Sequence, residues 1–171
     1  MADKIIRVFL ASPSGLDEER EIANQVIDRI NKTNGREFDI LLDLYMWEDV
    51  QPTFSRPQGQ INRYLEECDL FVGILWNWWG SPSGRYESGF EEEFEVAVEL
   101  RTIGVLEDIV LFFKKVEPAS LKDPGKQLEK VLKFKERISQ SKEALYKEFD
   151  DSYDWKDKIR ECISIVSTPK K

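Results

Sequence analysis

The most apolar segment of the chain is Asp69-Leu70-Phe71-Val72-Gly73-Ile74-Leu75-Trp76. A run of this kind, followed by a loop rich in Gly and Ser, is typical of a strand buried on both faces near the centre of a parallel sheet. On either side, apolar runs predict strands at 5–11, 38–47, 109–114 and 144–149, with helices between them and after the last. We therefore expect an α/β fold, a doubly wound sheet of five parallel strands with helices on both faces.

Length and charge restrict the class of protein. The chain has 171 residues and a net charge of −8. We expect one domain at 1–167, with 168–171 as a disordered tail or the start of a linker to further domains. The negative charge argues against nucleic acid or an anionic membrane as partner. No apolar run approaches the roughly 20 residues that span a bilayer. A strand follows the first residues directly, which predicts no signal peptide and a cytoplasmic location.

The chain contains no histidine. This excludes Ser-His-Asp and Cys-His mechanisms and every metal site that depends on imidazole. With only Cys68 and Cys162, a Cys-rich zinc or iron–sulfur site is excluded as well. The chemistry that remains available uses carboxylates, hydroxyls, arginines and aromatic rings.

Ligands of open α/β sheets bind beyond the carboxyl ends of the strands, so the candidate site lies in the loops at those ends. These loops supply hydroxyl groups and backbone N–H groups after the first strand, and aromatic and basic side chains after the second and third. Such rings either stack on a flat ligand or pack beneath the loops. The basic side chain either binds a phosphate or is simply solvated. The candidates are Ser12, Pro13, Ser14, Trp47, Trp76, Arg85 and Tyr86.

The helix expected at 90–101 carries five glutamates, four of them near its start. At about 100° per residue, Phe90, Phe94 and Ala97 share one apolar stripe, and Glu93 lies at the edge of that stripe. The other four are predicted to lie on a solvated face; they are Glu91, Glu92, Glu95 and Glu99. Ser88-Gly89-Phe90-Glu91 fits a capping box, which provides a structural role for Glu91 but none for Glu93. Glu93 is therefore the candidate catalytic carboxylate.

Two segments resemble a family of uncharacterised bacterial TIR-like domains, often found at the amino terminus of STAND-type NTPases and other defence proteins. One is the opening strand and loop, Arg7-Val8-Phe9-Leu10-Ala11-Ser12-Pro13-Ser14-Gly15-Leu16-Asp17-Glu18-Glu19-Arg20. The other runs from Cys68 to Trp76 and continues from Gly80 to Glu95. The resemblance covers nearly the whole chain and implies a flavodoxin-like, TIR-like fold.

The wider superfamily includes TIR domains and nucleoside deoxyribosyltransferases. In both, a glutamate in the helix after the third strand acts on an N-glycosidic bond, four residues before a small residue. Glu93 stands four residues before Ala97, and Ser88 precedes it much as in the transferases, so the resemblance adds Ser88 to the binding candidates. Phe90 and Glu95 depart from the transferase pattern, where Thr and Gly are common.

The resemblance implies an NAD glycohydrolase that cleaves the nicotinamide–ribose bond, acts in bacterial defence or signalling and self-associates. NAD would then be the substrate, and the resemblance implies no metal and no resident cofactor. Two alternatives stay open. One is a TIR-type protein–protein interaction module without activity, and the other is an enzyme like the nucleoside deoxyribosyltransferases.

Overall fold

A computed structural model describes residues 4–33, 37–46, 57–82, 84 and 86–167. Its five strands form one parallel sheet in the order β2-β1-β3-β4-β5. The strands are β1 (Lys4–Ala11), β2 (Ile40–Tyr45), β3 (Leu70–Leu75), β4 (Asp108–Lys114) and β5 (Leu145–Phe149). The fold predicted from the sequence is confirmed, with the apolar segment at 69–76 supplying the central strand, all six residues of which are buried.

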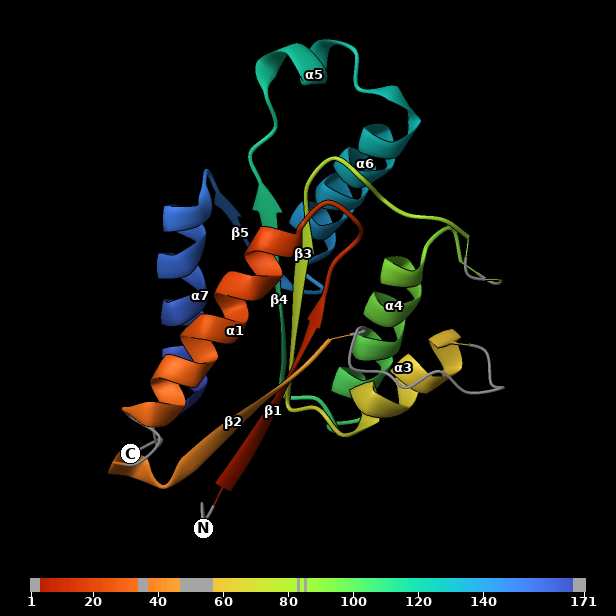
Figure 1. Ribbon diagram of the computed structural model, residues 1–171. Coiled ribbons are helices and arrows are strands. Elements are labelled where there is room, and N and C mark those ends of the chain that lie inside the picture. The colour runs from red at the N-terminus through yellow and green to blue at the C-terminus, as the bar shows by residue number, and fades with distance from the viewer. Residues whose placement is uncertain (1–3, 34–36, 47–56, 83, 85, 168–171) are drawn as a thin grey trace.

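Helices cover both faces of the sheet (Figure 1). One face packs against α1 (Asp17–Lys32) and α7 (Ser152–Ser167). The other packs against α3 (Pro57–Glu66), α4 (Gly89–Thr102) and α6 (Gly125–Ser141). Alternation along the strands explains this division, because Val8 and Leu10 face the first pair of helices whereas Phe9 and Ala11 face the second group.

The structure differs from the sequence predictions in several places. The second strand begins at Ile40 and not at residue 38, because Asp39 has a φ of 56°, outside the extended region that a strand requires. Helix α3 begins at Pro57, since proline is tolerated in a first helical turn. A short additional helix, α5 (Pro118–Lys122), follows β4, and none of its residues is buried.

Gly73 lies within β3, and the space beside its Cα is already filled by neighbouring side chains. A methyl group at this position would come within 2.6 Å of Leu111 Cδ2 and 3.0 Å of the Phe90 ring. Both side chains are in the core, so neither has room to withdraw. Gly73→Ala is expected to lower the free energy of unfolding by about 1–3 kcal/mol in urea titrations. In a Leu111→Ala background the same substitution should cost clearly less; equal costs in both backgrounds would contradict the steric explanation.

Candidate functional site

A cavity of about 260 Å³ opens at the carboxyl ends of β1 and β3. These two strands are neighbours at the point where the strand order reverses direction, the usual ligand position in a doubly wound sheet. The loop after β1, the loop after β3 and the starts of α1 and α4 all contribute. The lining residues are Ser12, Pro13, Ser14, Arg20, Ile61, Trp79, Gly80, Gly89, Phe90 and Glu93.

Glu93 reaches the cavity from α4. The helix starts where it does because the Ser88 side chain caps it, accepting a hydrogen bond from the Glu91 backbone N–H at 3.1 Å. The Glu91 carboxylate accepts in turn from the Glu87 N–H at 3.0 Å, one residue earlier than in a standard capping box. Glu93 lies about one turn beyond the first residue of the helix, Gly89, and is only 7% exposed. The sequence thus predicted the structural role of Glu91 and the inward orientation of Glu93.

The prediction for Glu92 was wrong, since we expected it on the solvated face and it is 2% exposed. The helical wheel assumed that α4 buries a single stripe against the sheet. In the structure α4 also has neighbours on its flanks, with α3 on one side and Phe134 of α6 within 5.0 Å (ring centroids) of Phe94. Glu92 is buried but does not line the cavity, whereas Glu93 does.

Arg20 is a site residue that the sequence analysis missed. Its side chain lines the cavity, only 7% exposed, and its Nη1 donates to Ser12 Oγ at 2.9 Å. Its Nη2 also pairs with the Asp17 carboxylate one turn earlier. A signal was present, because Leu16, Arg20 and Ala23 follow one apolar stripe of the first helix. A charged residue within such a stripe is either paired in the interior or placed at a site.

The floor of the cavity is aromatic and is held in place by α6. Trp79 is 4% exposed, with its ring centroid 5.9 Å from that of Phe90 and 5.1 Å from that of Phe134. Gln127 Oε1 accepts hydrogen bonds from the N–H groups of Trp79 and Gly80 at 2.8 and 3.0 Å. Its Nε2 donates to the Gly80 carbonyl at 3.3 Å. One side chain of α6 thus fixes the loop after β3.

Of the predicted site residues, the structure brings Glu93 together with Ser12, Pro13 and Ser14. Trp76 does not line this cavity: it packs against the core beneath α1 and α7, and its ring faces Lys114 Nζ at 4.3 Å. Tyr86 and Ser88 do not line it either. Trp47 and Arg85 lie outside the described residues, as does the predicted tail at 168–171.

Neither cysteine is suited to nucleophilic chemistry. Both are free thiols. Burial raises the pKa of Cys68 to about 12 and that of Cys162 to about 11, so both stay protonated at neutral pH. Among the described residues, no group of three or more Cys, Asp or Glu side chains is placed to hold a metal ion. No helix in that part of the chain is long and apolar enough to cross a membrane.

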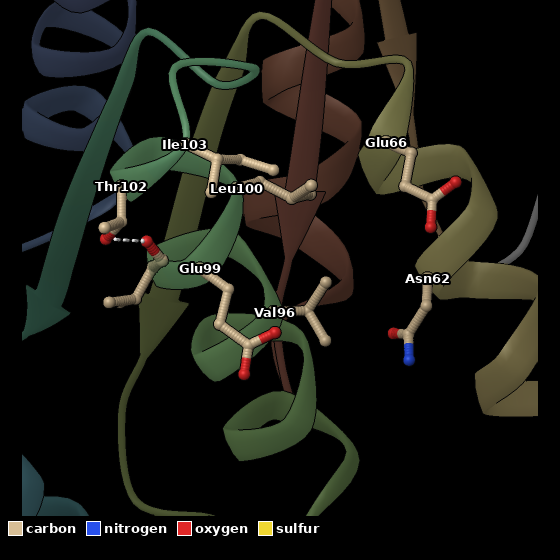
Figure 2. Close-up of a pocket in the computed structure, with 8 residues that line it drawn as sticks. Asn62, Glu66, Val96, Glu99, Leu100, Thr102 and Ile103 are labelled. Carbon is tan, nitrogen blue, oxygen red and sulfur yellow. Dashed lines mark hydrogen bonds between the residues drawn. The ribbon is translucent and has the colours of Figure 1, made fainter.

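A larger hollow, of about 570 Å³, lies between α3 and α4 (Figure 2). Its walls are apolar at Val96, Leu100 and Ile103, and the Thr102 hydroxyl is occupied by a hydrogen bond of 2.8 Å to the Val98 carbonyl. Thr102 and Ile103 stand at the end of α4 that lies near the amino ends of the strands, far from the switch point. The smaller cavity, which combines a buried carboxylate with a buried guanidinium, is the better candidate for chemistry.

Fold and cavity together define a doubly wound α/β protein with a site at its topological switch point. The chain belongs to the family described as "Domain of unknown function (DUF4062)", whose model matches residues 7–164. No curated protein matches it in sequence.

Solved structures resemble the chain in fold alone. Translation elongation factor SelB from Methanococcus maripaludis, in complex with the GTP analogue GPPNHP, has 14% identity over 98% of this chain and a TM-score of 0.50; the chain spans only 34% of the SelB chain. A de novo designed Rossmann 2x3 protein has 12% identity over 100% of this chain and 96% of its own, with a TM-score of 0.44. General stress protein 14 from Treponema denticola, in complex with FMN, has 11% identity over 94% of each chain and a TM-score of 0.44.

Proposed function

We propose that this domain is an NAD glycohydrolase, with Glu93 as its catalytic carboxylate. The observation that supports the proposal best is the position of Glu93, buried and lining a cavity at the switch point beside the Ser12–Ser14 loop. The helical wheel and the resemblance of the sequence to TIR-like domains had selected the same residue by separate routes. The cavity contains no rival carboxylate among its described lining residues.

The reaction needs one carboxylate and a water molecule. The bond between C1′ of the ribose and the nicotinamide nitrogen breaks, its electron pair leaves with nicotinamide, and positive charge develops on the sugar. The Glu93 carboxylate stabilises that charge or bonds to C1′, and water then completes the reaction. NAD⁺ and water give nicotinamide, ADP-ribose and one proton. Because the positive charge of NAD⁺ moves from the nicotinamide ring to the ribose in the transition state, a fixed negative group beside the ribose accelerates the step.

The size of the cavity bears on how NAD would bind. Small-molecule sites commonly enclose about 300–1,000 Å³, and the cavity at Glu93 is slightly smaller than that range. It suits a ring and a sugar better than a whole dinucleotide. We therefore place the nicotinamide riboside end in the cavity, with C1′ beside Glu93 and the nicotinamide ring against the floor formed by Trp79 and Phe90. The adenosine half would lie outside it.

The test is release of nicotinamide from NAD by the purified chain, at low and at high protein concentration and after forced clustering through a fused oligomeric domain. Release in any of these conditions supports the proposal. No release in all three would overturn it and would favour an interaction module without activity. Exchange of the free base on a deoxynucleoside, with NAD left intact, would favour a transferase instead.

A further inference from the structure

We propose that Arg20 binds the phosphate group next to the reacting ribose, so that the site accepts nucleotides and discriminates against nucleosides. The inference rests on the proposed function and specifies the substrate class of the same site. Glu93 suits the cationic end of NAD, which carries the positive charge of the nicotinamide ring. Arg20 lines the same cavity with the opposite charge, and the pyrophosphate of NAD supplies the matching anion.

The guanidinium is held in a defined orientation. Nη1 donates to Ser12 Oγ at 2.9 Å, and Nη2 pairs with Asp17 one turn earlier on α1. Ser12 itself lines the cavity, so the hydrogen bond joins two lining residues and connects the loop after β1 to the helix that follows. A planar guanidinium presents five N–H donors in a fixed fork, which matches the oxygens of a phosphate better than an ammonium group does.

A second feature of the cavity also favours an anion. Gly89 and Phe90, the first two residues of α4, both line it. Backbone N–H groups at the start of a helix point along its axis and favour negative charge. Glycine at position 89 carries no side chain that would hinder a ligand from approaching the backbone. Arg20 from α1 and the amino terminus of α4 thus approach one cavity from two elements, on either side of the junction between β1 and β3.

Nucleosides provide the contrast. A neutral deoxynucleoside offers a ring and a sugar but no anionic group for Arg20 to bind. Every substrate with a phosphate on the ribose 5′ oxygen offers such a group. The transferase alternative requires good binding of an unphosphorylated substrate. Recognition of phosphate by Arg20 would therefore distinguish the glycohydrolase from the transferase. The distinction would lie in substrate binding and not in the catalytic carboxylate.

Steady-state kinetics with NAD and with nicotinamide riboside tests the inference. Arg20→Met is expected to raise KM for NAD about ten-fold or more while kcat changes less than three-fold, and to leave kcat/KM for nicotinamide riboside unchanged. Arg20→Lys should recover part of the affinity for NAD. Arg29→Met, on the exposed side of the same helix, is the matched control and should match wild type with both substrates. Thermal unfolding of each variant identifies any that do not fold, and Arg20→Lys then carries the test.

The outcomes separate this inference from the proposed function. An unchanged KM for NAD in folded Arg20→Met, or equal losses with both substrates, overturns the role of Arg20 and leaves the glycohydrolase intact. If wild type hydrolyses neither substrate, calorimetric titration with ADP-ribose decides. If wild type binds ADP-ribose and Arg20→Met weakens that binding ten-fold, the phosphate site is supported without the proposed reaction. If wild type does not bind ADP-ribose, both the phosphate site and the proposed function are overturned.

Discussion

Glu93→Gln is expected to lower the rate of nicotinamide release by about 10³-fold or more, because the amide keeps the shape of the side chain but removes the charge that stabilises the developing cation. The free energy of unfolding should change by no more than about 1 kcal/mol, since the substitution leaves packing unaltered. Nicotinamide measured by chromatography, together with urea titration of the same samples, provides both readouts.

The adjacent Glu92 offers an unusually close control. It is a glutamate of the same helix, even more buried than Glu93 at 2% exposure, but it does not line the cavity. Glu92→Gln should therefore retain most of the wild-type rate even if it is less stable. A Glu93→Gln variant that cleaves NAD as fast as wild type would refute the assignment. Equal losses in both variants would show that buried charge in this part of α4 supports the fold, not the reaction.

The largest expected effect on stability concerns the pair formed by Lys114 and Glu19 across the end of the sheet. Lys114 Nζ lies 2.7 Å from Glu19 Oε1, and the two side chains are 20% and 2% exposed. Lys114→Met would leave a buried carboxylate without its cation, and the free energy of unfolding should fall by about 3 kcal/mol in urea titrations. Loss of the contact between Lys114 and the Trp76 ring acts in the same direction.

Two further variants make this prediction specific. Lys115→Met removes the neighbouring lysine, whose ion pair with Asp150 is 3.9 Å long and exposed on both sides; it should cost less than about 0.5 kcal/mol. The double variant Lys114→Met/Glu19→Gln should be more stable than Lys114→Met alone, because it removes the charge that the first substitution leaves unpaired. If the double variant instead loses the sum of the free energies lost by Lys114→Met and by Glu19→Gln measured separately, the two residues are not coupled.

A residue of the candidate site can be predicted from the sequence when the pattern of its own helix, strand or loop defines its position. Glu93 could be found because a helix has a known period, and its neighbours Phe90, Phe94 and Ala97 define the buried stripe. Ser12, Pro13 and Ser14 could be found because a loop after a buried strand must lie at the carboxyl end of the sheet. Trp76 was a candidate for ligand binding, but the alternation of β3 directs it to the core beneath α1 and α7.

Arg20 and Gln127 show what requires the folded chain. Gln127 lies 47 residues beyond Gly80, yet it holds the loop on which Gly80 stands. No local pattern marks such a residue, because the contact exists only once α6 packs beside α4. Likewise, Arg20 and Glu93 belong to different helices and meet at one cavity only because β1 and β3 are neighbours in the sheet.

The sequence by itself determined the class of fold, since the order of apolar runs and helical periods admits few arrangements other than a doubly wound parallel sheet. It also determined that histidine and Cys-rich metal chemistry are absent, and that Glu93 turns inward. Only the tertiary structure decided which loops meet at the switch point, which aromatic residues are core and which buried cation shares the cavity with Glu93. The physical reason is that periodicity defines the direction of a side chain within its own element, whereas the neighbours of that element depend on packing between segments far apart in the chain.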